Sequence, residues 1–97
     1  MIYLLKLIGL ATRARKVVIG EDFSVKTIQK KQAKLVFLAS DAGVNTTKKI
    51  TDKCKFYEVT LITDYNTEEL SMAIGNKNRK VVTIVDDGFA NKMKERM

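Results

Sequence analysis

Cationic side chains are concentrated in the first third of the chain, on both sides of a glycine, Gly20. Residues 1–34 contain eight lysines and arginines but only two carboxylates, Glu21 and Asp22, and account for six of the seven net positive charges. Like charges gathered in this way repel one another and favour binding to a polyanion. The isoelectric point near 9.6 fits a nucleic acid or an anionic membrane surface as the partner.

Gly20 lies where a predicted strand passes into a predicted helix. A glycine there permits a positive φ and allows a partner's backbone to approach closely. The backbone amides of Glu21, Asp22 and Phe23 would be free to donate hydrogen bonds at the start of the helix. Because two carboxylates repel phosphate, we expect this segment to contact base edges rather than phosphates. For one of the two carboxylates we expect capping of its own helix, which leaves the other to contact a base.

The helix predicted over residues 21–31 has two different sides. The side expected to pack carries Val25, Ile28 and Gln32. The opposite side carries Phe23, Lys26, Thr27 and Lys30. An aromatic ring beside lysines is typical of an RNA-binding surface, with the ring for a base and the cations for phosphates. The alternative is that Phe23 folds back over the preceding strand and that the lysines are only solvated.

A second polar cluster follows the fourth predicted helix and consists of Asn76, Lys77, Asn78, Arg79 and Lys80. Most turns of this composition are only solvated, but if this loop folds beside Gly20, both segments form one groove. Asp22 and the nearby amides would then read guanine edges. The residues expected to hold phosphates are Lys16, Lys26, Lys30, Lys77 and Arg79.

Several kinds of chemistry are excluded by composition. The chain has no histidine and a single cysteine, Cys54, which argues against a zinc or iron–sulfur site and against an internal disulfide. It also lacks a nucleophile elbow, a P-loop and a dinucleotide-binding glycine motif. Asp86 and Asp87 could suggest a magnesium site, but they fit the N-terminal cap of the last helix better. We therefore expect a protein that is not an enzyme and needs no cofactor.

The apolar N-terminus does not read as a targeting or membrane segment. Lys6 interrupts it, no basic stretch precedes it and no small-residue cleavage site follows before Arg13. It is also too short to span a bilayer. We expect a soluble, cytoplasmic monomer that does not bind membranes.

The elements that must position these residues alternate between helical and extended patterns, which is typical of an α/β domain. Buried helix faces are predicted at Leu4, Leu7, Ile8 and Ala11, at Val44, Thr47, Ile50 and Cys54, and at Phe89 and Met93 of a helix over 88–97. Strands are predicted over 16–19, 34–40, 56–62 and 80–85. A further helix is expected between Asn66, which forms a capping box with Glu69, and Gly75. The result is helices on both faces of a roughly four-stranded sheet.

A family resemblance is carried by several segments in their joint order. These are residues 9–22, 33–42, 45–54 and 87–92, together with Ala73-Ile-Gly75. They resemble the ribosomal L7Ae/L30e family of kink-turn RNA-binding proteins, and most closely its small bacterial members. The resemblance covers nearly the whole chain. It implies a three-layer α/β/α sandwich with a mixed sheet, forming one RNA-binding domain over residues 1–97.

The same resemblance implies a structured RNA as partner, namely a sharply kinked stem with sheared G·A pairs, and an association with the ribosome. It places the RNA face on Gly20, Asp22, Phe23, Lys26 and the loop 76–80. Asp22 and Phe23 stand where other members usually carry asparagine and glutamate, which predicts weaker kink-turn specificity or a preference for another RNA. The alternative is a protein-interaction module that docks a ribosomal or transcription-related partner through Phe23 and the first helix.

Overall fold

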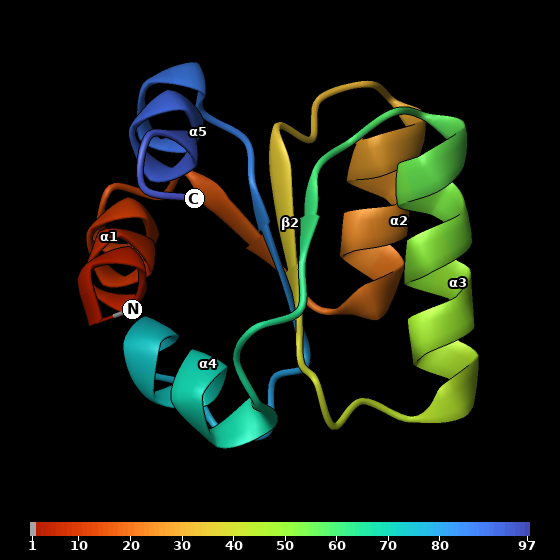
Figure 1. The fold of residues 1–97 in the computed structure, drawn as a ribbon, viewed down its shortest axis with the longest axis horizontal. Coiled ribbons are helices and arrows are strands. Elements are labelled where there is room, and N and C mark those ends of the chain that lie inside the picture. Colours follow the sequence, from red (N-terminus) through yellow and green to blue (C-terminus); the bar gives the residue numbers. More distant parts are fainter. Residues whose placement is uncertain (1) are drawn as a thin grey trace.

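In a computed structural model of the protein, which describes residues 2–97, five helices and four strands form three layers (Figure 1). The helices are α1 (Ile2–Arg13), α2 (Glu21–Gln29), α3 (Val44–Phe56), α4 (Thr67–Ile74) and α5 (Asp87–Lys94). The strands are β1 (Val17–Ile19), β2 (Leu35–Leu38), β3 (Leu61–Ile62) and β4 (Val81–Ile84).

The strands form one mixed sheet in the order β1-β4-β2-β3. β4 pairs antiparallel with both β1 and β2, whereas β2 and β3 are parallel. Every residue of β2 and β4 is buried, because helices cover both faces of the sheet. The predicted α/β/α sandwich with a mixed four-stranded sheet is confirmed.

The two faces of the sheet carry different helices. α1, α4 and α5 cover one face, and α2 and α3 cover the other (Figure 1). The buried side of α1 consists of the four predicted residues, Leu4, Leu7, Ile8 and Ala11. On the second face, Ile28, Val36, Ile50 and Cys54 pack together, and burial raises the pKa of the Cys54 thiol to about 11. The thiol is therefore a core group that stays protonated at neutral pH.

The predicted helix caps are present. The Asn66 side chain accepts from the Glu69 amide at 2.8 Å, and the Glu69 carboxylate accepts from the Asn66 amide at 3.0 Å. Gly75 ends α4 with a φ of 73°. The Asp86 carboxylate accepts from the Phe89 amide at 2.9 Å and so begins α5. Each cap satisfies a backbone group that the helix itself leaves unpaired.

Several boundaries and faces differ from the prediction. Phe56 ends α3 instead of beginning a strand, and β3 starts only at Leu61. Val44 is 83% exposed and Thr47 is also exposed, because the first turn of α3 extends past the residues that pack, Ile50 and Cys54.

Helix α2 also presents a different face from the predicted one. Thr27 is buried rather than outward, and its hydroxyl is satisfied by donating to the Phe23 carbonyl at 2.8 Å. Gln32 is exposed because α2 ends at Gln29, so the helical spacing does not continue to it. In α5, Met93 is buried as predicted and Phe89 is half-buried.

Candidate nucleic-acid interface

The loop 76–80 lies directly beside the start of α2. The Gly20 amide donates to the Val81 carbonyl at 2.9 Å, since β1 and β4 are neighbours in the sheet. A shallow cavity of about 190 Å³ is formed by Gly20, Glu21, Thr46, Asn78, Arg79, Lys80 and Val81. The predicted convergence of the two segments is confirmed. We call the surface formed by residues 20–23, Lys26 and residues 76–80 the groove.

Gly20 has a backbone conformation that only glycine adopts readily. Its φ of 102° and ψ of 158° lie outside the regions open to residues with a Cβ atom. It is the N-cap of α2, and no side chain caps this helix. Within residues 2–97, the amides of Glu21, Asp22 and Phe23 have no acceptor, so three donors point out of the helix start. The groove therefore offers hydrogen-bond donors to a ligand.

Glu21 is bound to α3 rather than to its own helix. The Thr46 hydroxyl donates to Glu21 Oε1 at 2.6 Å, and Lys49 Nζ lies 3.0 Å from Glu21 Oε2. The hydrogen bond from Thr46, followed by the contact with Lys49, lowers the pKa of the Glu21 carboxyl. The expectation that a carboxylate caps α2 is wrong, because Glu21 has stronger donors available across the helix pair. Its charge is compensated, so it repels phosphate less than the sequence suggested.

Thr46 and Lys49 are residues of this surface that the sequence alone did not indicate. They lie 25 or more positions after Glu21, and no spacing rule connects them to it. The only available signal was a polar first turn in the third predicted helix, and that is the ordinary composition of an exposed helix.

Phe23 and Lys26 form an exposed pair on the outer side of α2. The Phe23 side chain is 65% exposed, and Lys26 Nζ lies 5.8 Å from the centre of its ring. This separation is within the range of a cation–π interaction. The alternative in which Phe23 folds back over β1 is wrong. One face of the aromatic ring remains available to a partner, and a cation lies one turn further along the helix.

Hydrogen bonds from α4 hold the loop 76–80 in place. Ser71 Oγ accepts from the Arg79 amide at 2.9 Å and donates to the Arg79 carbonyl at 3.4 Å. Asn78 turns the chain with a positive φ of 54°. The side chains of Lys77 and Arg79 are exposed. The loop backbone is thus anchored while its cationic side chains remain free to contact a ligand.

A second network fixes the far side of the loop. Lys80 Nζ donates to Thr67 Oγ1 at 3.3 Å, and Thr67 donates to Asp41 through both its hydroxyl, at 2.6 Å, and its amide, at 2.8 Å. These two bonds from Thr67 lower the pKa of the Asp41 carboxyl. Lys80 is therefore partly engaged within the protein, unlike its neighbour Arg79.

Lys16 and Lys30 do not lie at the groove. Lys16 comes before β1, and four residues of extended chain place it about 13 Å from Gly20. Lys30 follows the last turn of α2, about 15 Å from Gly20 along the helix. Because α2 returns along β1, both lysines lie at the opposite end of the sheet (Figure 1). The prediction that one groove includes them is wrong.

The alternative docking surface is also divided by the fold. Phe23 is on α2 and therefore lies on the other side of the sheet from α1 (Figure 1). These two parts cannot form one continuous patch. Among residues 2–97, no helix has the length and apolar character needed to cross a membrane.

Comparison with known families identifies the chain. Residues 3–94 match the family described as ribosomal protein L7Ae/L30e/S12e/Gadd45. The protein belongs to this family. Among its relatives in the L7Ae/L30e/S12e/Gadd45 family, the Bacillus subtilis RNA-binding protein YlxQ is 51% identical over 87 residues, covering 90% of this chain and 87% of the relative. The Enterococcus faecium RNA-binding protein YlxQ is 47% identical over 91 residues, covering 94% of this chain and 87% of the relative.

Two solved structures superpose on the chain. A Bacillus halodurans protein of unknown function superposes with a TM-score of 0.90 at 42% identity, over 95% of this chain and 93% of that one. The Giardia lamblia 15.5 kD RNA binding protein superposes with a TM-score of 0.87 at 21% identity, over 97% of this chain and 81% of that one. The second likeness shows a shared fold.

Proposed function

We propose that this L7Ae/L30e/S12e/Gadd45 family member is a non-enzymatic RNA-binding protein that recognises a kink-turn or a similarly bent stem through the groove. The observation that carries the proposal is the contact between the loop 76–80 and the glycine-opened start of α2. Support comes from the two YlxQ relatives, which are named as RNA-binding proteins.

The groove has separate groups for each part of a bent RNA. The free amides after Gly20 donate to base or sugar oxygens, and the exposed Asp22 carboxylate accepts from the imino and amino groups of a guanine edge. The exposed ring of Phe23 stacks on an unpaired base. A regular A-form duplex hides these base edges in a deep, narrow groove, whereas a kinked internal loop exposes them.

Cations at the rim of the groove hold the RNA backbone. Lys26, Lys77 and Arg79 are exposed and have no carboxylate within ion-pair distance among the described residues. They therefore lose no internal ion pair when they bind phosphates. The groove binds without catalysing a reaction, and we propose that the protein acts as a cytoplasmic monomer on RNA of the ribosome or its precursors, without a cofactor.

The proposal is tested by titrating three RNAs of equal length at two salt concentrations: a kink-turn stem, an unkinked duplex and a single strand. We expect the kink-turn RNA to bind most tightly. Arg79→Gln should weaken binding and reduce the salt slope by about one. Lys92→Gln, an exposed lysine on α5, is the matched control and should leave the affinity for the kink-turn RNA unchanged. Equal affinity for the three RNAs would overturn recognition of a bent stem.

A further inference from the structure

Most of the excess charge in the first third of the chain lies away from the groove. Of the eight basic residues in 1–34, Lys26 lies at the groove and Lys6 lies on α1. The other six lie in two loops at the opposite end of the sheet or, for Arg13, at the end of α1 that leads into one of them. We call these six residues the basic end: Arg13, Arg15, Lys16, Lys30, Lys31 and Lys34.

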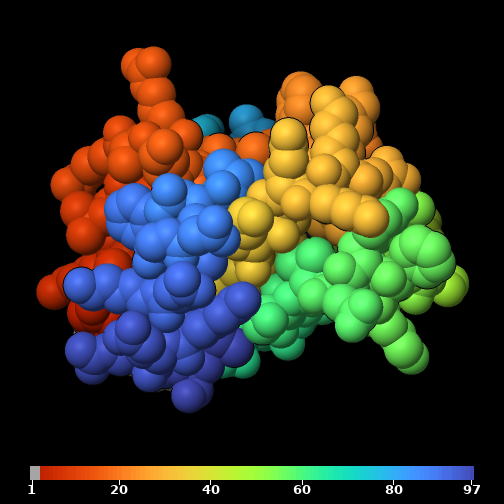
Figure 2. Space-filling view, turned by 90° about the horizontal axis from the view of Figure 1, so that it is seen from above, coloured from red at the N-terminus to blue at the C-terminus, as the bar shows by residue number. Residues whose placement is uncertain are grey.

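The sheet brings the two loops of the basic end together. The Lys16 carbonyl accepts from the Val85 amide at 3.0 Å, and the Lys34 amide donates to the Ile84 carbonyl at 2.8 Å. The loops therefore flank the end of β4 on its two sides, about 10 Å apart given the spacing of neighbouring strands. Figure 2 looks onto this end and shows the red-orange and amber segments on either side of the blue chain that leaves β4.

The cations of the basic end are mostly uncompensated. Lys34 Nζ lies 3.6 Å from Asp87 Oδ1, but among the described residues the other five members have no ion pair. The nearby Asp86 carboxylate is occupied by the Phe89 amide. Neither loop contains an acidic residue. Self-repulsion at this end therefore destabilises the fold unless a polyanion binds.

Two of these cations also occupy positions that a glycine would fill with less strain. Arg15 has a φ of 60° and Lys31 a φ of 61°, both in the left-handed region. The chain carries a long cationic side chain at each of these two turns, and each side chain is exposed. Glu58 and Asn78 share this backbone conformation, so it fixes where the two cationic side chains lie and does not by itself assign them a role.

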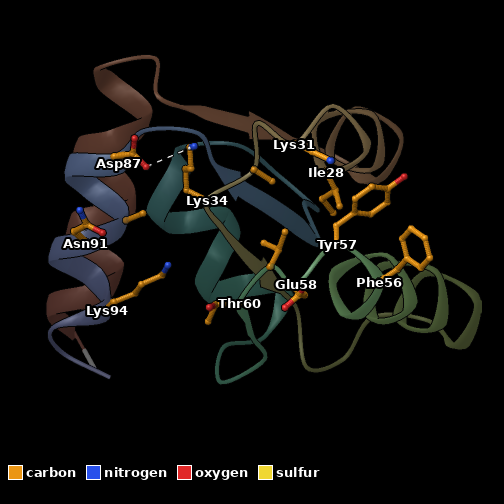
Figure 3. A pocket seen from close by; sticks show the side chains of 13 residues that line it. Ile28, Lys31, Lys34, Phe56, Tyr57, Glu58, Thr60, Asp87, Asn91 and Lys94 are labelled. Atoms are coloured by element: carbon orange, nitrogen blue, oxygen red, sulfur yellow. Dashed lines mark ion pairs between the residues drawn. The ribbon is translucent and has the colours of Figure 1, made fainter.

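A cavity opens beside the basic end and offers room for a nucleotide. It measures about 580 Å³, within the range of about 300–1,000 Å³ for ligand pockets. Its lining includes Lys31, Lys34 and Lys94, the aromatic residues Phe56 and Tyr57, and the carboxylates Glu58 and Asp87 (Figure 3). The two rings pack edge to face at 4.9 Å, and Phe56 is 78% exposed. The lysines suit a phosphate and the exposed ring suits an unpaired base, and Asp87 is already paired with Lys34.

We propose that the basic end is a second RNA-binding surface, so that the protein holds two RNA segments at opposite ends of its sheet. The inference rests on the proposed function in taking RNA as the ligand. Two cationic loops with an adjoining cavity that carries aromatic rings fit a phosphate backbone with an unstacked base. The protein would then join the segment bound at the groove to a second one.

A bridging assay tests this proposal. A kink-turn RNA is immobilised, saturated with protein and washed, and a fluorescent RNA duplex without a kink-turn is added. We expect the wild-type protein to retain the duplex. The double variant Arg15→Gln/Lys31→Gln should bind the immobilised RNA within twofold of wild type but lose the duplex. In solution, its salt slope for the duplex should fall by about two.

A matched variant controls for net charge. Lys6→Gln/Lys48→Gln removes the same number of charges from exposed positions on α1 and α3, and should retain the duplex. Retention by Arg15→Gln/Lys31→Gln equal to wild type would overturn the second surface. So would wild-type protein that binds the immobilised RNA but captures no duplex, or that captures a labelled polyglutamate more strongly than the duplex. Failure of the groove proposal looks different, since the immobilised RNA itself would then not bind.

Discussion

The groove and the basic end both carry cationic side chains, but they differ in how their charged groups are held. At the groove, some charged groups are fixed by hydrogen bonds: Glu21 is bound by Thr46 and Lys49, and Lys80 reaches Thr67. At the basic end, five of six cations have no ion pair among the described residues. Fixed polar groups favour selectivity, whereas free cations supply salt-dependent affinity for any backbone. In our proposals, shape recognition is therefore confined to the groove, whereas the basic end supplies only general attraction to RNA.

The largest expected effect comes from replacing Gly20, the glycine whose positive φ shapes the groove. Gly20→Ala should lower the free energy of unfolding by about 1–3 kcal/mol, because φ 102° and ψ 158° strain any residue with a Cβ atom. Urea denaturation measures this change. Gly43→Ala is the control, since Gly43 has a φ of −62° and open space around it, and should cost less than about 1 kcal/mol. Equal losses for the two variants would contradict the special role of Gly20.

The next effect comes from comparing two exposed phenylalanines, one at the groove and one beside the basic end. Phe23→Ala should weaken binding of a kink-turn RNA by about 1–3 kcal/mol through loss of stacking. Phe56→Ala, on a side chain of similar exposure beside the basic end, should leave that affinity unchanged. Fluorescence anisotropy at fixed salt measures both. If Phe56→Ala weakened groove binding as much as Phe23→Ala, the two surfaces would not be independent.

A smaller effect is expected from loosening the loop 76–80. Ser71→Ala leaves the Arg79 amide without its acceptor and should cost about 1 kcal/mol of stability. Hydrogen exchange at Arg79 should accelerate, and the basic end should still bind the duplex RNA. Ser24→Ala is matched to it, because Ser24 Oγ is buried and has no hydrogen-bond partner among residues 2–97, so its removal should be neutral or stabilising. A larger loss at Ser24 than at Ser71 would contradict this reading of the two hydroxyls.

The smallest effect concerns the compensated charge at the groove. The pKa of Glu21 is lowered from its ordinary 4.5, so the carboxylate stabilises the fold above that pH and loses this contribution as the pH falls through its lowered pKa. Glu21→Gln should therefore cost about 0.5 kcal/mol at pH 7 and nothing in strong acid. Urea denaturation at pH 7 and pH 2 measures the difference. A cost that persists unchanged in acid would show that charge is not its origin.

The sequence determined the features that depend on near neighbours. The capping box of Asn66 and Glu69, the left-handed Gly75 and the Asp86 cap each use groups a few residues apart, so residue type and spacing were enough to predict them. The buried stripe of α1 followed from the helical spacing of its apolar residues, and the strand β2 from its nearly continuous apolar run. The family resemblance supplied the layer order and the convergence of the loop 76–80 with Gly20, which local patterns alone do not contain.

Only the tertiary structure decided where the charges lie. Lys16 and Lys30 lie on either side of Gly20 in the chain. Because β1 arrives at this glycine from the far end of the sheet and α2 returns toward it, both lysines lie at the far end, away from the groove. The partners of Glu21 depend in the same way on the packing of α2 against α3. The number of charges along a sequence does not show where those charges lie in space. When a strand and a helix reverse the chain, residues close in sequence are separated, and residues distant in sequence come together.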